Sequence, residues 1–192
     1  MMVAFRALLC VLALLLASPT HAHPGHAIEM TAIAGVMHPW LGLDHALAAV
    51  AVGIWASAQS GYRRWFAPLA FVSAMVLGAW VGHAVGKPGF TDAGIAGSVA
   101  LLGCLILAVE GTPASLALLG IATFAVAHGL AHGGEAASAA SWPLYLTGLA
   151  TGTMLLHAAG LAVGTLMRGH ASRLWPIAGF AFAAAGTWLL AA

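Results

Sequence analysis

The sequence predicts an all-α membrane protein, in which a cleavable signal peptide precedes a six-helix transmembrane bundle with an interrupted first helix. Three observations support this prediction. The 192 residues are 62% hydrophobic and only 6% charged, with a mean hydropathy of +0.99, whereas a soluble domain carries about 25% charged residues. The apolar residues form runs close to the roughly 20 residues that cross a bilayer as a helix. Short stretches containing glycine, proline or charged residues separate these runs.

Residues 1–22 have the pattern of a secretory signal peptide. Arg6 provides a positively charged start, residues 7–17 form a short apolar core, and small residues follow at the positions that a signal peptidase reads. We therefore expect cleavage after Ala22, which leaves residues 23–192 as one transmembrane domain. The alternative is an uncleaved first transmembrane helix, but an apolar core this short argues against it.

The remaining sequence consists of six apolar spans joined by short breaks. The spans cover approximately residues 31–58, 65–86, 93–109, 114–133, 142–167 and 174–191. The first and fifth exceed the length that a bilayer requires, which implies tilt, a kink or extension beyond it. In the fifth span, Gly148, Gly152, Gly160 and Gly164 form a ridge of small residues. Such a ridge predicts that a neighbouring helix packs closely against this span.

The distribution of basic residues predicts the orientation. A cleaved signal peptide leaves the mature N-terminus outside, and only Lys87 then falls in an outer loop. The inner loops carry four arginines, Arg63, Arg64, Arg168 and Arg173. Lys and Arg are enriched in cytoplasmic loops of membrane proteins. We therefore expect a bacterial inner-membrane protein whose mature N- and C-termini both face the periplasm.

Histidine is the unusual component of this composition. The chain has 10 histidines, against six Lys and Arg and five Asp and Glu. Ionisable groups inside a membrane are costly and usually mark a pathway or a bound ion. Cys10 lies in the signal peptide and Cys104 in an apolar span, so a metal would need nitrogen and oxygen ligands. The net charge of +1 gives no indication of nucleic-acid binding.

The first motif is HPWLGLDH, which contains His38, Asp44 and His45. On a straight helix, His38 and His45 would lie roughly 10 Å apart, and Asp44 would point about 100° away from His45. Pro39 disfavours helical geometry at His38, so we expect the helix to be interrupted there. An interruption would allow His38 to fold toward Asp44 and His45 as one metal site. The alternative is that Asp44 only hydrogen-bonds a histidine to stabilise a helix contact.

The second motif is HGLAHGGE, which contains His128, His132 and Glu135. Histidines at i and i+4 share one helical face, with Cβ atoms about 6 Å apart, close enough to grip one metal. We expect the helix to end at Gly133 and Gly134, which places Glu135 in an outer turn. There, Glu135 is either a further ligand or a solvated side chain.

The candidate ligands lie at different predicted depths in the membrane. A lone membrane histidine often only hydrogen-bonds a neighbouring helix, but His157 lies beside the glycine ridge of the fifth span. The predicted topology places seven candidates toward the outside: His23, His26, His38, His83, His128, His132 and Glu135. It places Asp44, His45 and His157 deeper. This distribution predicts an entry funnel that leads to a narrow inner site.

These segments resemble those of the HupE/UreJ family. The resemblance rests on HPWLGLDH after a signal peptide, HGLAHGGE, LLHAAG around His157 and the six-span layout, and it covers essentially the whole mature chain. The family has a histidine that is followed, after five residues, by an Asp-His pair, and His38, Asp44 and His45 match this motif. The resemblance implies a nickel permease or accessory protein, with Ni²⁺ as the substrate and hydrogenase or urease maturation proteins as partners. The donors alone also suit cobalt, zinc or copper.

Three hypotheses follow. The first is a nickel permease, and the second is a membrane metal-binding or assembly factor that does not itself translocate metal. The third, a membrane redox enzyme with bound metal or haem, has least support, because clustering of histidines on the outer side fits uptake better. We therefore expect no enzymatic activity. The sequence contains no ATP-binding loop and leaves both the coupling of transport and the oligomeric state open.

Overall fold

The computed structural model describes residues 31–136 and 141–192, and every regular element within these ranges is helical. The predicted signal peptide, His23 and His26 lie outside the described residues. Short 3-10 turns, η1 (Gly61–Trp65) and η2 (Arg168–His170), precede α4 and α8. The α-helices are α2 (Ala32–Leu41), α3 (Leu43–Ser57), α4 (Phe66–Val85), α5 (Thr91–Leu107), α6 (Ala114–Glu135), α7 (Trp142–Met167) and α8 (Ala171–Ala191).

The chain is a multi-pass membrane protein. Among the described residues, four helical segments are long and apolar enough to cross a bilayer: Gly61–Val85, Ala114–Glu135, Trp142–His170 and Arg173–Ala191. The consecutive helices α2 and α3 meet the same test only when they are taken together as one bent span. Helix α5 is apolar but has only 17 residues, fewer than the roughly 20 that usually span a membrane. The predicted total of six spans therefore stays a prediction.

The interruption of the first span is confirmed, but its predicted position was wrong. Helices α2 and α3 meet at 86°, and the residue between them is Gly42, with an extended backbone (φ −93°, ψ 117°). Pro39 lies inside α2. Pro39 removes one i→i−4 hydrogen bond and weakens the helix there, and α2 ends two residues later, at Leu41. Gly42 suits the break because a Cβ there would lie 2.9 Å from His45 Nδ1.

The glycine ridge of α7 is in close contact with both halves of the broken span, as predicted. A Cβ on Gly148 would overlap the carbonyl oxygen of Ala32 in α2, and one on Gly160 would overlap that of Val50 in α3. Helix α7 therefore supports the break, since α2 packs on its first half and α3 on its second half. Small residues permit this approach because no side chain separates the two backbones.

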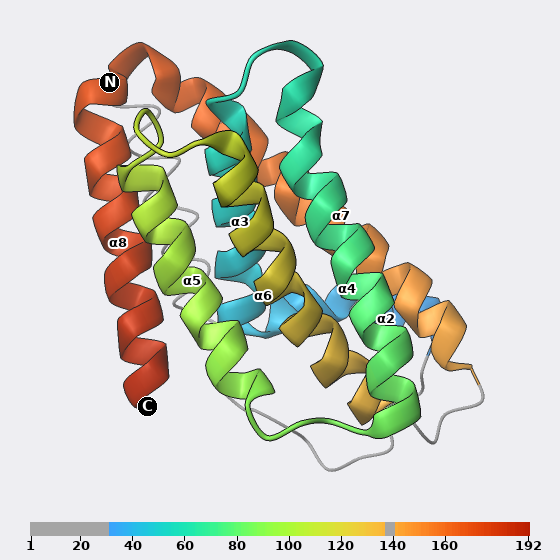
Figure 1. Ribbon diagram of the computed structural model, residues 1–192. Helices are drawn as coiled ribbons and strands as arrows, with labels where there is room; N and C mark the ends of the chain where they lie inside the picture. The colour runs from blue at the N-terminus through green and yellow to red at the C-terminus, as the bar shows by residue number, and fades with distance from the viewer. Residues whose placement is uncertain (1–30, 137–140) are drawn as a thin grey trace.

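Helix α3 is the centre of the bundle. All of its residues from 46 to 57 are buried. The most extensive helix pairs are α4 with α6, α5 with α8, and α3 with α7. Helices α3 to α8 run alternately up and down, and α2 crosses near the lower end (Figure 1). The start of α3, the end of α6 and the C-terminus lie together at that lower end.

Candidate metal centre

Three histidines from three different helices converge at the break between α2 and α3. They are His38 of α2, His45 of α3 and His132 of α6, and each offers one nitrogen within 4.8 Å of the others. The ring centroid of His132 lies 4.8 Å from that of His38 and 4.7 Å from that of His45. The 86° bend at Gly42 brings the first two histidines together. We call these three residues the histidine cluster.

Asp44 orients one member of the histidine cluster. Its Oδ1 lies 2.6 Å from His45 Nδ1 and accepts a second bond, of 2.8 Å, from the His45 backbone N–H. A carboxylate can only accept, so His45 Nδ1 carries the proton and donates it to Asp44. His45 Nε2 therefore keeps its lone pair, and this buried atom has no hydrogen-bond partner in the part of the chain that the structure describes. A carboxylate that orients a histidine in this way is the usual support of a metal-ligating imidazole.

His132 has the environment of a ligand rather than of a satisfied core residue. It is 2% exposed, and neither of its ring nitrogens has a hydrogen-bond partner within residues 31–136 and 141–192. Buried polar side chains normally have at least one such partner, because leaving them without one is costly. The unpaired nitrogens of His45 and His132 therefore fit a bound metal ion, which would accept their lone pairs.

His128 lies one turn from His132 but has different neighbours. Its Nε2 lies 3.1 Å from Ser98 Oγ of α5, and its ring centroid lies 5.1 Å from that of His45. It does not belong to the set of three donors in the histidine cluster. Residues of the two motifs thus lie side by side: His132 contacts both His38 and His45, and His128 contacts His45 one helical turn further into the bundle.

His157 lies deeper in the bundle and is fully buried. Its Nδ1 donates to the Ala49 carbonyl oxygen of α3 at 2.8 Å, and its Nε2 has no hydrogen-bond partner among the described residues. The ring of Phe71 contacts both His157 and His128, with its centroid 5.1 Å from the first and 5.2 Å from the second. An apolar ring therefore lies against both the deep histidine and the histidine one turn from His132.

The two remaining described candidates have other contacts. His83 stacks on Trp142 with ring centroids 4.1 Å apart. Glu135 accepts a 2.9 Å hydrogen bond from Lys87, which also pairs with Asp92. Burial lowers the pKa of Lys87, but the two carboxylates outweigh burial, and the pKa rises above the ordinary value of 10.5. Glu135 thus forms part of an ion-paired group that joins the turn after α4 to the end of α6.

The expectation that α6 ends at the Gly133-Gly134 pair was wrong. Helix α6 continues to Glu135. A Cβ on Gly133 would overlap the carbonyl oxygen of Ala79, and one on Gly134 would overlap the backbone of Lys87. The two glycines therefore serve close packing against α4 and the turn after it, and they do not terminate the helix.

Several residues at this site were not identified from the sequence. Ser98 and Phe71 contact His128, and the ring of Tyr145 lies 5.7 Å from that of His38. Ser98 was detectable in principle, because it is a polar residue inside an apolar span. Phe71 and Tyr145 carry no such signal, since aromatic residues are common in membrane helices.

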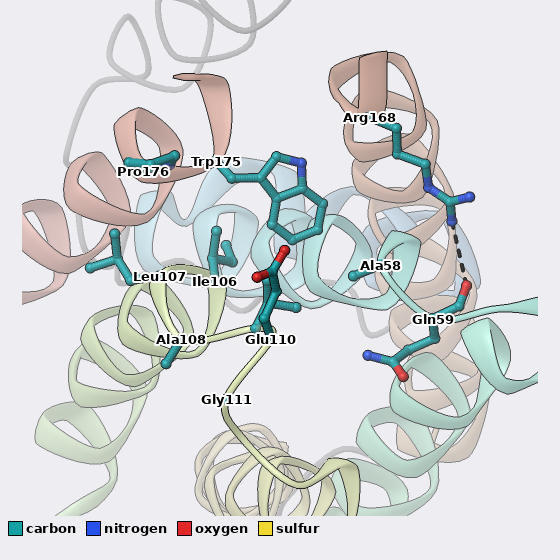
Figure 2. A pocket seen from close by; sticks show the side chains of 11 residues that line it. Ala58, Gln59, Ile106, Leu107, Ala108, Glu110, Gly111, Arg168, Trp175 and Pro176 are labelled. Atoms are coloured by element: carbon teal, nitrogen blue, oxygen red, sulfur yellow. Dashed lines mark hydrogen bonds between the residues drawn. The ribbon is translucent and has the colours of Figure 1, made fainter. Parts of the chain in front are cut away.

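A pocket of about 710 Å³ lies at the opposite end of the bundle from the histidine cluster. It is formed by the ends of α3, α5 and α7 and the beginning of α8, and Gln59, Glu110, Arg168 and Trp175 are among its lining residues. Figure 2 shows the Glu110 carboxylate directed toward the Trp175 ring, and Arg168 Nη2 donates to the Gln59 carbonyl oxygen at 3.4 Å. Of the candidate metal ligands that the structure describes, none lines this pocket.

Comparisons with known proteins agree with the resemblance noted in the sequence. The family model described as HupE / UreJ protein matches residues 11–189. Protein HupE of Rhizobium leguminosarum bv. viciae is 38% identical over 180 residues, which cover 93% of each sequence. No solved structure matches the chain.

Proposed function

The chain belongs to the HupE/UreJ family, and from this premise we propose that it carries a divalent transition metal, nickel(II), across the bacterial inner membrane. The nickel would supply hydrogenase or urease maturation. Nickel is in this proposal the transported substrate and not a resident cofactor.

The observation that carries the proposal is the histidine cluster itself. His38, His45 and His132 come from three helices and two separate sequence motifs, yet their donor nitrogens lie within 4.8 Å of one another. Among the described residues, His45 Nε2 and both ring nitrogens of His132 are buried without a hydrogen-bond partner, which is costly unless these atoms serve a ligand. Asp44 accepts a hydrogen bond from His45 Nδ1–H, and this bond leaves the lone pair of His45 on Nε2, where it can bind a metal.

The donors support a transition metal, and family membership narrows the metal to nickel. Imidazole nitrogen suits zinc, copper, iron and nickel, whereas magnesium and calcium prefer oxygen ligands. The intrinsic affinity of such a site would be higher for copper than for nickel. Selection of nickel would therefore depend on geometry and on which metals are available outside the membrane.

The proposed direction of transport is inward. With six spans and a periplasmic C-terminus, the histidine cluster lies toward the periplasm, because the C-terminus is at the same end of the bundle (Figure 1). His23 and His26 would then precede the cluster on the outer side and assist capture of the metal. The pocket at the other end would open toward the cytoplasm.

A second candidate is an accessory protein that binds metal without translocating it, and one observation favours it. On the inner side of His157, Gly160 and Gly164 of α7 pack directly on Val50 and Ser57 of α3. This contact leaves no room between the two helices at that level. Transport therefore requires a rearrangement that opens the inner half of the bundle, whereas binding alone does not.

Two measurements on the full chain test the proposal. Uptake of radioactive nickel into proteoliposomes measures translocation, and equilibrium dialysis of the detergent-solubilised protein measures binding. We expect the wild-type protein to bind and to take up nickel. His45→Ala and His132→Ala should lower nickel affinity by more than the roughly 10- to 100-fold that loss of an outer-shell partner costs.

His170→Ala is the matched control, because it removes an imidazole from η2, outside the histidine cluster. Its binding and uptake should equal those of the wild-type protein. Nickel binding without uptake would favour the accessory protein. Unchanged affinity in both His45→Ala and His132→Ala would contradict the assigned site.

A further inference from the structure

We propose that Phe71 is a gate between an outer metal station, the histidine cluster with His128 beneath it, and an inner station at His157. This inference rests on the proposed transport function and adds the step at which the metal is handed inward. Phe71 lies on α4, which contributes no ligand to the histidine cluster.

The first argument is the order of the rings. The ring centroids of His45 and His128 lie 5.1 Å apart, those of His128 and Phe71 5.2 Å apart, and those of Phe71 and His157 5.1 Å apart. Phe71 is 2% exposed, and both imidazoles beside it are buried. Successive ring contacts thus lead from His45 through His128 and Phe71 to His157, and Phe71 is the ring among these four that cannot bind a metal.

The second argument is that the histidines on both sides of Phe71 are prepared as neutral ligands. Ser98 Oγ donates its proton to the Ile95 carbonyl oxygen at 2.6 Å, so it can only accept from His128 Nε2 at 3.1 Å. This bond leaves the lone pair of His128 on Nδ1. His157 donates from Nδ1 to Ala49, so its lone pair is on Nε2. Each imidazole therefore keeps one nitrogen for a metal.

The third argument concerns which ring can move. Hydrogen bonds from α5 and α3 hold the two imidazoles, whereas a phenyl ring has no polar atom with which to make such a bond. One turn along α4, Met75 contacts Thr153 of α7 through its sulfur atom, and methionine side chains adapt readily to a moving neighbour. A metal ion cannot cross an apolar ring without losing its donors at high cost. Passage from His128 to His157 therefore requires the Phe71 ring to swing aside.

The experiment compares Phe71→Leu, which makes the barrier smaller, with Phe71→Trp, which makes it larger. Initial rates of nickel uptake into proteoliposomes are measured over a range of nickel concentrations, and nickel binding is measured by dialysis. We expect the saturating rate to rise roughly tenfold in Phe71→Leu and to fall roughly tenfold in Phe71→Trp, a change of about 1.4 kcal/mol in the barrier for each. Nickel affinity should stay that of the wild-type protein, because the outer station is intact.

Phe66→Leu and Phe66→Trp are the matched controls, since Phe66 lies on the same helix and is 47% exposed. They should leave both the saturating rate and the affinity unchanged. A change in the saturating rate without a change in affinity is not expected if Phe71 only stabilises the fold. A Phe71→Leu variant that loses affinity and rate together would show that purely structural role and overturn the gate.

The outcomes separate this inference from the function on which it rests. Wild-type uptake together with wild-type saturating rates in the Phe71 variants would overturn the gate and leave transport standing. Nickel binding without uptake by the wild-type protein would overturn both transport and the gate. If Phe71→Trp does not fold, as judged by loss of nickel binding, the rate of Phe71→Leu alone decides.

Discussion

At the scale of single residues, the contact between Asp44 and His45 determines what each can do. The carboxylate of Asp44 lies outside the set of three donors and accepts a hydrogen bond from His45 Nδ1–H. This geometry is the alternative considered for Asp44 in the sequence, in which it hydrogen-bonds a histidine. The bond also serves the metal site, because it directs the lone pair of His45 to Nε2. Asp44 therefore positions a ligand in the proposed site.

Asp44→Asn should lower nickel affinity by about 10- to 100-fold, the usual cost of losing an outer-shell partner. An amide keeps the shape but removes the negative charge, and its NH₂ group can donate to Nδ1 and impose the wrong tautomer on His45. Equilibrium dialysis measures the affinity. Asp92→Asn is the control, since Asp92 pairs with Lys87 away from the histidine cluster. Wild-type affinity in Asp44→Asn would contradict the positioning role.

The two histidines of the second motif should differ in effect, although they are one turn apart. His132 offers a nitrogen to the histidine cluster, whereas His128 bonds Ser98 beneath it. We expect His132→Ala to lower nickel affinity strongly, and His128→Ala to keep affinity near wild type while slowing uptake at saturating nickel. Parallel dialysis and uptake measurements distinguish them. Equal losses of affinity in both variants would restore the expectation that the pair grips one ion.

At the scale of secondary-structure elements, the break between α2 and α3 forms the site. A continuous helix would keep His38 and His45 roughly 10 Å apart, whereas the bend brings their ring centroids to 5.8 Å. Gly42 makes the bend possible because its missing side chain leaves space for the Asp44–His45 pair. The proposed metal site therefore depends on Gly42, a residue that is not itself a ligand.

Gly42→Ala should weaken nickel binding without unfolding the bundle. Its new Cβ would lie 2.9 Å from His45 Nδ1 and 3.1 Å from Asp44 Oδ1, closer than ordinary contacts, so the pair must shift. The matched control is Gly89→Ala, where a Cβ would meet nothing within 4 Å. Dialysis gives the affinity of each variant, and size-exclusion chromatography shows whether the variant stays folded. Wild-type affinity in Gly42→Ala would show that the break tolerates a side chain.

At the scale of the whole molecule, the proposed direction of transport depends on which end of the bundle faces outward. The start of α3, the end of α6 and the C-terminus lie at one end of the bundle (Figure 1), and the first two carry His45 and His132 of the histidine cluster. The pocket beside Gln59 and Arg168 is lined by residues at the other ends of α3 and α7. The arginines that predict a cytoplasmic loop, Arg63 and Arg64, are in η1, between the end of α3 and the start of α4. The positive-inside rule thus predicts that the end of the bundle with the histidine cluster faces the periplasm.

Reporter fusions test this orientation directly. A fusion at Gly61 should be active in the cytoplasm, and a fusion at the C-terminus should be active in the periplasm. The expectation combines the basic-residue asymmetry with the alternating directions of α3 to α8. A cytoplasmic C-terminus would contradict the six-span topology and would place the histidine cluster on the inner side.

The sequence by itself determined the class of the fold and most of its helices. The predicted span 142–167 coincides with α7, and the predicted start at residue 114 is that of α6. This agreement has a physical cause: inside a bilayer the backbone must satisfy its own hydrogen bonds, so a long apolar run becomes a helix whatever its neighbours are. The family was also recognisable, because its motifs are local in the sequence.

Only the tertiary structure decided which of the motif residues meet. Spacing along a helix shows which side chains share a face, and it placed His128 and His132 one turn apart on α6. It could not show that His132 lies beside His38 and His45, or that Phe71 contacts both His128 and His157. Those side-chain contacts depend on how closely helices that are distant in the sequence approach each other. The distance between such helices is set where glycines meet a neighbouring backbone, as Gly160 meets Val50 and Gly129 meets Met75. Packing between backbones far apart in the sequence, rather than any local pattern, places the ligands together.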